Sequence, residues 1–379
     1  MSRHPAVWPT PTHLLRTTQP DHPVQFFAPA TLAATARQFR RGFPGLVTYA
    51  VKANDAPEVL DTLVAAGITT FDVASPDEMA RARTASRQAV LHYNNPVRSV
   101  AEIQAARDFG VTSYSVDDAG ELNKIAAHIP PAGIEVAVRL KLPVAGAAYD
   151  FGAKFGAPPE TCIPLLRQVA ALGFRPAMTF HPGTQCPDPA AWALYIRAAG
   201  EIANEAGVTL DRLNVGGGFP AQRGPAAPDL AAIFAEIART TATAFGPPAP
   251  ALLCEPGRAM VADAGALATR VKSIRADGTV FLNDGIYGGL SEAPILGAVD
   301  RLQVLAPDGT LRQGKPTPRT IFGPTCDSLD RLPEPLPLPA DLAEGDYVIF
   351  HGMGAYATVT ATRFNGYGRI VPATVQSLI

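Results

Sequence analysis

The stretch Asn214-Val215-Gly216-Gly217-Gly218-Phe219-Pro220 decides between the two folds that alternating strands and helices allow. In a doubly wound open sheet, a glycine-rich turn of this kind follows the first strand. Here the three glycines follow the seventh candidate strand, so the sequence favours a closed (β/α)8 barrel. Glycines also let the backbone approach a ligand and present N–H groups to an anion, although a flexible turn is the simpler explanation.

Eight candidate strands alternate with alanine-rich amphipathic stretches over a length typical of such a barrel. The strands are predicted to end at Val51, Val73, Tyr93, Ser115, Leu140, Phe180, Val215 and Cys254. The helices are predicted at residues 57–66, 76–85, 100–109, 119–128, 159–172, 189–206 and 229–244. We therefore expect an α/β fold with a TIM-like barrel domain over residues 26–262.

The helical periodicity fades after residue 264, and short β-rich stretches follow. They lie at residues 268–274, 279–283, 301–305, 319–322 and 347–351, with a proline-rich connector at 332–339. We expect a second domain, a β-sandwich or small β-barrel, formed by residues 1–25 and 263–379. The segment 24–27 is expected to add a strand to it.

Composition excludes several classes of function. The chain has 379 residues, of which 47% are hydrophobic, and a net charge of −2, so it can bury a large core but shows no basic footprint for nucleic acid. No apolar run reaches membrane-spanning length, and the first residues lack the pattern of a signal peptide. Cys162, Cys186, Cys254 and Cys326 are too far apart to form metal-binding pairs. We therefore expect a cytoplasmic protein with reduced thiols and no bound metal.

Polar residues follow the candidate strands, where a barrel places its active site. They are Lys52, Asp72, Asn94, Asp117, Arg139, His181, Asn214 and Glu255. A lysine, a histidine, a glycine loop and a glutamate at one edge are difficult to explain as ordinary loop residues.

Several of these features match one cofactor, pyridoxal phosphate. Its aldehyde condenses with a lysine such as Lys52, and its protonated ring nitrogen needs a carboxylate such as Glu255. Its phosphate suits the three glycines and Arg258, because strands seven and eight often hold phosphate in barrels. Alone, each feature has a plainer explanation, such as an exposed lysine or a Glu255–Arg258 ion pair. His181 alone is more often a core histidine, but in this combination we expect it to stack on the cofactor ring.

Six segments, in order over nearly the whole chain, carry a resemblance to a known family. They are residues 49–54, 181–185, 216–220, 255–258, 323–330 and 354–356 with 364–366. With them the chain resembles the fold-III pyridoxal-phosphate decarboxylases, which have an alanine-racemase-like barrel. Within that group it is most similar to ornithine decarboxylases and their lysine-accepting relatives.

The resemblance implies roles at the matching positions. Lys52 binds the cofactor aldehyde, His181 stacks on the ring, and Asp72 and Glu255 lie near it, with Glu255 keeping the pyridine nitrogen protonated. The phosphate ligands implied are Gly216, Gly217, Gly218, Gly257, Arg258, Thr184 and Tyr356. The family also implies a head-to-tail homodimer with shared active sites, in which Cys326 and Asp327 come from the partner chain. Cys326 then protonates the α-carbon, and Asp327 binds the distal amine of the substrate. Tyr287 is also expected to contact the substrate.

The residue types favour decarboxylation of a basic L-amino acid. Glu255 argues against a racemase, which pairs this nitrogen with arginine in the family pattern, and Asp327 favours a terminal amine. We predict L-ornithine, giving putrescine for polyamine biosynthesis, as first substrate, and L-lysine, giving cadaverine, as second. Arginine, diaminopimelate and carboxynorspermidine remain alternatives, as do a catalytically silent regulatory homologue and a racemase.

The sequence departs from the family at three places. Pro182 stands where valine is usual, and Asn214 replaces the aspartate that usually precedes the glycines. In the stretch 284–294 and just beyond it, the aspartate that helps to bind the distal amine is missing, with Leu296 near its place. Glu292 is the nearest acid, and we hypothesise that Glu292 and Asp327 set which cationic side chain fits. A solvated loop residue is the alternative explanation for Glu292.

Overall fold

The computed structural model describes residues 6–142, 154–297 and 300–379, which form two compact units. The barrel unit comprises Ala36–Pro220 and Pro228–Gly257, and the sheet unit comprises Met1–Thr35, Ala221–Ala227 and Arg258–Ile379. The barrel unit thus begins ten residues after the predicted boundary at 26 and ends five residues before the one at 262, and the segment 221–227 belongs to the sheet unit. The segment 28–35 belongs to the sheet unit, where the Ala28 N–H donates to the carbonyl of Ala264 at 2.9 Å.

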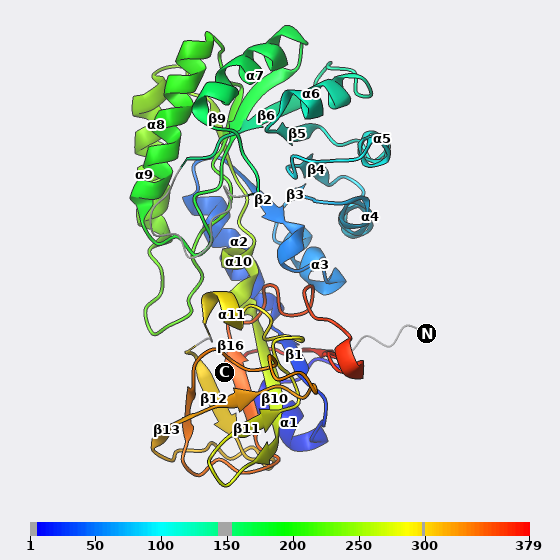
Figure 1. Cartoon of the computed structure of the whole chain (residues 1–379), viewed down its shortest axis with the longest axis vertical. Helices are drawn as coiled ribbons and strands as arrows, with labels where there is room; N and C mark the ends of the chain where they lie inside the picture. The colour runs from blue at the N-terminus through cyan, green and yellow to red at the C-terminus, as the bar shows by residue number, and fades with distance from the viewer. Residues whose placement is uncertain (1–5, 143–153, 298–299) are drawn as a thin grey trace. The chain divides into compact units, whose positions relative to one another are not determined.

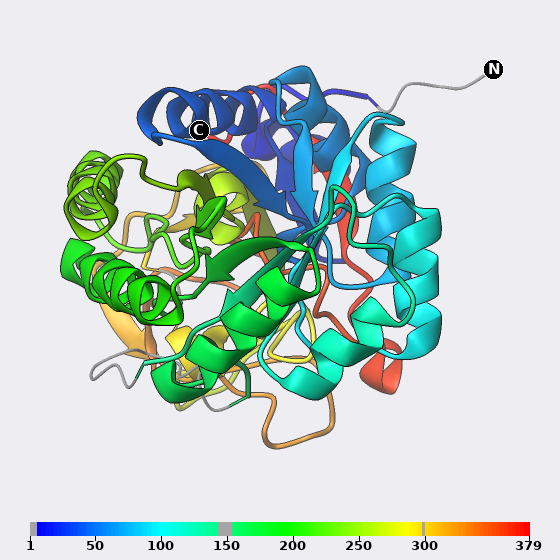
Figure 2. The same ribbon diagram turned by 90° about the horizontal axis from the view of Figure 1, so that it is seen from above.

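Eight parallel strands close into a barrel, which confirms the predicted fold (Figures 1 and 2). The ring closes where the last strand pairs with the first, with Leu46 opposite Leu253 and Val47 opposite Cys254. The strands are β2 (Leu46–Ala50), β3 (Thr70–Asp72), β4 (Val90–Tyr93), β5 (Ser113–Val116), β6 (Glu135–Arg139), β7 (Arg175–Thr179), β8 (Arg212–Asn214) and β9 (Ala251–Cys254). Each strand ends within one residue of its predicted end.

Helices surround these strands (Figure 2). Several of these helices begin at residues whose side chains cap the first turn. Ser75 accepts a hydrogen bond from the Glu78 N–H at 3.3 Å, and Ser99 forms a reciprocal capping box with Glu102. The helices are α3 (Pro57–Ala65), α4 (Pro76–Ala85), α5 (Val100–Asp108), α6 (Ala119–Ala126), α7 (Pro159–Ala171), α8 (Pro189–Ala206) and α9 (Leu230–Phe245). The sequence prediction missed α1 (Pro11–Thr18) and α2 (Pro29–Gly42).

Aromatic packing anchors the glycine loop to the helix layer. Phe219, which follows the three glycines, is 2% exposed and stacks on Trp192 of α8 with ring centroids 5.1 Å apart. Its ring also meets Phe39 of α2 and Phe234 of α9 edge-on, at 5.6 and 5.7 Å. Because such pairs are geometrically specific, they fix the position of the loop that precedes them.

The sheet unit is built on a seven-stranded mixed sheet. Its main strand order is β12-β16-β10-β1-β17, and β11 joins β10 to β14. As predicted, β1 belongs to this sheet, between β10 and β17. The seven strands are β1 (Val24–Phe27), β10 (Gly265–Ile274), β11 (Val280–Leu282), β12 (Leu302–Leu305), β14 (Ile321–Phe322), β16 (Tyr347–His351) and β17 (Val371–Thr374). A separate two-stranded sheet is formed by β13 (Pro316–Arg319) and β15 (Leu336–Pro339).

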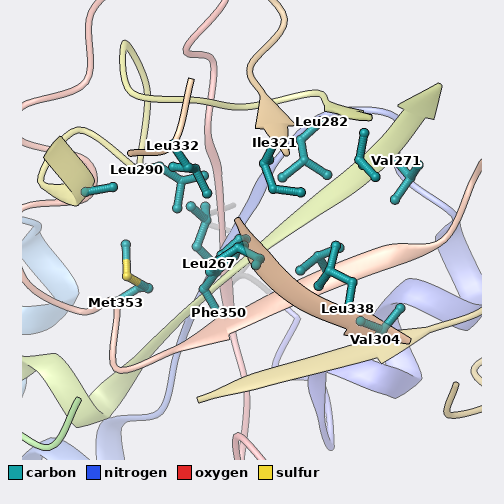
Figure 3. Packing of buried hydrophobic residues seen from close by; sticks show 14 of the residues in the cluster. Leu267, Val271, Leu282, Leu290, Val304, Ile321, Leu332, Leu338, Phe350 and Met353 are labelled. Carbon is teal, nitrogen blue, oxygen red and sulfur yellow. The ribbon is translucent and has the colours of Figure 1, made fainter. Parts of the chain in front are cut away.

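Both faces of the long strand β10 are buried, because successive side chains point to opposite sides. Leu267 and Val271 belong to the apolar cluster in Figure 3, which also contains Leu338 and Phe350. The alternate residues of β10 pack against a second cluster, which includes Leu15 of α1. The proline-rich segment predicted as a connector is partly a strand, because β15 pairs with β13 and buries Leu336 and Leu338. Within the described ranges, no helix is long and apolar enough to cross a bilayer.

Candidate active site

The carboxyl edge of the barrel brings together most of the polar residues that the sequence singled out. Asp72, Arg139 and Asn214 are the last residues of β3, β6 and β8. Asn94 and Glu255 directly follow β4 and β9, and His181 is the second residue after β7. Lys52 lies in a 3-10 turn, η1 (Val51–Ala53), one residue further from its strand than predicted.

Lys52 is held on a rigid turn whose neighbours are buried. The Tyr49 hydroxyl donates to the carbonyl of Asn54 at 2.9 Å, and the Asn54 N–H donates to the carbonyl of Val51 at 3.1 Å. The Lys52 charge lowers the pKa of His181 and opposes the rise in the pKa of Asp72. The amine therefore lies close to both groups.

His181 presents a neutral ring. Burial, then the charges of Lys52 and Arg139, holds its pKa well below the ordinary value. The Gly183 N–H donates to Nδ1 at 3.2 Å, so the ring proton belongs on Nε2. The preceding residue, Phe180, stacks on Tyr195 of α8 with centroids 4.7 Å apart, which fixes the strand end. A flat, neutral imidazole is suited to stacking on an aromatic ligand.

The three glycines are required by close packing of backbone. A Cβ on Gly216, where φ is +68°, would lie 2.0 Å from the Phe180 carbonyl oxygen. A Cβ on Gly217 would lie 2.8 Å from the Glu255 carbonyl oxygen and 3.3 Å from His181 Nε2. The loop thus packs directly against the residues predicted to contact a cofactor ring, and a merely flexible turn does not explain it.

Two acids interact electrostatically at this edge: Asp72, which is buried, and Glu255, which is half-buried. Burial, then the negative charge of Glu255, raises the pKa of Asp72 well above its ordinary value. Glu255 accepts hydrogen bonds on one oxygen, Oε1, from the side-chain amides of Asn94 and Asn214. No described residue donates a hydrogen bond to the other oxygen, Oε2, so a donor from a ligand can reach it.

These groups fit pyridoxal phosphate by their chemistry. Lys52 would supply an amine for the aldehyde, His181 an aromatic face, Glu255 a carboxylate for the ring nitrogen, and the glycine loop a side-chain-free backbone for the phosphate. Two other predicted ligands also belong to the barrel unit: Thr184 is half-buried in the turn after β7, and Gly257 is buried.

In the sheet unit, Arg258 is paired with Glu292. The Arg258 Nη1 donates to Oε2 of Glu292 at 2.6 Å, and Nη2 donates to Oε1 at 2.5 Å. The guanidinium lies 4.7 Å from the ring centroid of Tyr356. Two predicted phosphate ligands and the predicted specificity residue therefore form one cluster.

A second group in the sheet unit joins Cys326, Asp327 and Tyr287. The Tyr287 hydroxyl donates to Oδ2 of Asp327 at 2.5 Å, and this bond lowers the pKa of Asp327. The Cys326 thiol is free and its residue exposed, and its N–H donates to Oδ1 of Asn365 at 3.1 Å. The sequence motifs at 323–330 and 364–366 thus meet in the folded unit.

Sequence reasoning gave no role to three residues that organise these groups. Asn94 and Asn214 hold Glu255, and Asp330, 1% exposed, accepts hydrogen bonds from Ile286, Thr325 and the Thr325 hydroxyl. The signal for Asn214 was its departure from the usual aspartate. Asp330 stood in a quoted motif, and Gly323 beside it leaves the space that its carboxylate fills.

The fold and the residues at its carboxyl edge are together typical of a barrel enzyme that uses a pyridoxal cofactor. The family model described as "Pyridoxal-dependent decarboxylase, pyridoxal binding domain" matches residues 30–262, so the chain belongs to this family. It is a pyridoxal-phosphate-dependent amino-acid decarboxylase, which confirms the predicted cofactor and enzyme class.

Several similar proteins have names that specify a basic amino acid as substrate. The lysine/ornithine decarboxylase of Selenomonas ruminantium is 34% identical over 330 residues, which cover 85% of this chain and 81% of the relative. The crystal structure of the Paramecium bursaria Chlorella virus arginine decarboxylase matches with a TM-score of 0.86 at 26% identity, covering 95% and 98% of the two chains. The Vibrio vulnificus lysine/ornithine decarboxylase complexed with cadaverine matches at 0.81 and 28% identity, covering 94% and 95%.

Proposed function

We propose that the protein decarboxylates a basic L-amino acid, with L-ornithine as first substrate and L-lysine as second. The observation that carries this proposal is the Asp327 carboxylate, whose pKa is lowered by the Tyr287 hydroxyl and by the Leu329 N–H. An ionised carboxylate on an accessible loop recognises a terminal amine rather than a second carboxylate. The relatives named lysine/ornithine decarboxylase support the same substrate class.

The bound cofactor supplies the electron sink for the pair that remains on the α-carbon when CO2 leaves. In this proposal Lys52 binds its aldehyde, the neutral His181 packs on its ring, and Glu255 holds the proton on its pyridine nitrogen. The Cys326 thiol then gives its proton to the α-carbon. The phosphate is held by Gly216, Gly217, Gly218, Gly257, Thr184, Arg258 and Tyr356, with Asp72 near the ring.

We also propose a head-to-tail homodimer in the cytoplasm, in which Cys326 and Asp327 serve the partner's site. The exposed Cys326 and the neighbouring Leu329, 70% exposed, support such an interface. A proton-donating thiol must stay reduced, which a cytoplasmic location favours.

Product analysis tests the reaction and the substrate together. The holoenzyme is incubated separately with ornithine, lysine, arginine, diaminopimelate and carboxynorspermidine, with Lys52→Ala as the inactive control. We expect putrescine at the highest kcat/KM and cadaverine next. Product only from diaminopimelate or carboxynorspermidine would show that Asp327 does not recognise a simple terminal amine. Loss of chirality in deuterated water without amine would indicate a racemase, and no reaction with any substrate would support a silent homologue.

A further inference from the structure

The Glu255 carboxylate accepts hydrogen bonds from residues at the ends of two strands. Asn94, directly after β4, and Asn214, at the end of β8, both donate side-chain N–H groups to Oε1, with Asn214 Nδ2 at 2.5 Å. Both asparagines are buried, with exposed fractions of 6% and 4%. Two donors on one oxygen fix the rotation of the carboxylate, and among the described residues both engage Oε1 rather than Oε2.

The orientation of the Asn214 amide follows from its other contact. Its Oδ1 accepts the Gly216 N–H at 2.9 Å, so its Nδ2 must face Glu255. The backbone repeats the link, because the Glu255 N–H donates to the Gly216 carbonyl at 2.8 Å. Asn214 therefore joins the carboxylate to the first glycine of the loop.

Asn94 is fixed in a different way. Its carbonyl accepts the Ser115 hydroxyl at 2.7 Å, and its backbone N–H hydrogen-bonds Asp72, lowering a pKa that burial otherwise raises. Asn94 thus lies between the two acids and does not contact the glycine loop by a hydrogen bond of its side chain.

Neutral amides suit this position for an electrostatic reason. Burial, and then the negative charge of Glu255, already raises the pKa of Asp72. A carboxylate at residue 214 in the same orientation would place a third negative group against Oε1. The asparagine instead donates a proton to Oε1 and adds no charge.

We propose that Asn94 and Asn214 are positioning residues that clamp Oε1 of Glu255, so that Oε2 serves the protonated pyridine nitrogen, and that Asn214 also sets the phosphate loop. This inference rests on the proposed role of Glu255 toward that nitrogen. Asn94 acts on the ring end of the cofactor only, whereas Asn214 acts on both ends.

The NMR signals of two nuclei in the cofactor distinguish the effect of Asn94 from that of Asn214. The enzyme is loaded with pyridoxal phosphate labelled with 15N in the ring, and solid-state NMR follows the pyridine 15N and the phosphate 31P signals. Asn94→Ala should lower the proton affinity of the nitrogen about tenfold, the value of one lost hydrogen bond to a charged group, and leave 31P unchanged. Asn214→Ala should shift both signals and weaken cofactor binding by about tenfold. Asn123→Ala, on the exposed face of α6 in the same unit, should move neither.

Further variants distinguish a failure of the proposed role of Glu255 from a failure of the clamp alone. If Glu255→Gln leaves the 15N signal unchanged, the proposed role of Glu255 fails and the clamp with it. If Glu255→Gln moves the signal but both asparagine variants leave it in place, only the clamp is wrong. Circular dichroism of each apoenzyme checks folding, and Asn94→Ser and Asn214→Ser replace any alanine variant that does not fold.

Discussion

Arg258 and Glu292 form a two-point ion pair, with N–O distances of 2.6 and 2.5 Å. Their side chains are 10% and 26% exposed, so the pair is only partly screened by solvent. Arg223 lies near enough for its pKa to respond to both, lowered by burial and by Arg258, with Glu292 acting in the opposite direction. The negative charge of Glu292 therefore acts on the positive charges of both Arg258 and Arg223.

The first prediction concerns stability without cofactor. Glu292→Gln leaves Arg258 largely buried without its carboxylate, and we expect a loss of about 1–3 kcal/mol in the free energy of unfolding. Urea unfolding of the apoenzyme measures it. Glu334→Gln, at an exposed site in the same unit, is the matched control and should change stability by less than about 0.5 kcal/mol. Equal effects of the two variants would show that the ion pair does not stabilise the fold.

A second prediction separates the two roles open to Glu292. With its partner removed, Arg258 is free for an anion, so Glu292→Gln should bind pyridoxal phosphate more tightly, by about threefold to tenfold. The ratio of kcat/KM for ornithine and lysine should stay constant. A changed ratio with unchanged cofactor affinity would instead assign Glu292 to substrate selection, as the sequence suggested.

The third prediction tests Asp327 as the amine-binding group. Asp327→Asn removes the charge and keeps the shape, so kcat/KM for ornithine should fall by about 10- to 100-fold, the value of a charge-assisted hydrogen bond. Tyr287→Phe, which removes the hydroxyl that donates to Asp327, should produce a smaller rise in KM. The absorption spectrum of the bound cofactor should not change in either variant. Asp308→Asn, an exposed carboxylate in the same unit, serves as control.

The barrel was predictable because its signals are local. Apolar strands ending in polar residues, and helices opening on proline, serine or aspartate, place each boundary within a few residues of sequence. The candidate site residues could be identified for the same reason, because Lys52, His181 and Glu255 each stand in a short family motif that follows a strand.

The side-chain pairs that were missed at the site depend on contacts between distant residues. Asn94 and Glu255 are 161 residues apart, and Arg258 and Glu292 are 34 apart, so no local pattern links them. Strand β15 was missed because prolines normally interrupt strands, yet Pro337 and Pro339 lie on a two-stranded edge pairing that tolerates them.

A fourth prediction follows from the proposed shared site. Lys52→Ala and Cys326→Ala chains are each inactive or nearly so, but a mixed dimer regains one site with both residues intact. Random exchange makes about half of the dimers mixed, so we expect recovery to about one quarter of the activity of the unaltered enzyme. Native mass spectrometry verifies the exchange. Verified exchange without recovery would mean that both residues serve the same chain's site.

The last prediction concerns the buried Asp284, the second residue after β11. Burial raises its pKa to about 7, although the N–H groups of Gly289 and Gly285 act in the opposite direction. The unfolded chain loses this proton near pH 4, whereas the folded chain holds it until about pH 7, so stability falls as pH rises through this interval and then levels off. Asp284→Asn removes the titration, so the loss of unfolding free energy between about pH 5 and pH 8 should become smaller, by about 2–3 kcal/mol at most. The drop in Tm over the same interval should shrink accordingly. Asp277→Asn is the control, because hydrogen bonds from Thr279 lower the pKa of Asp277 and its loss cannot flatten the same slope. Parallel Tm curves for the enzyme and Asp284→Asn would show that Asp284 does not hold its proton in the folded state.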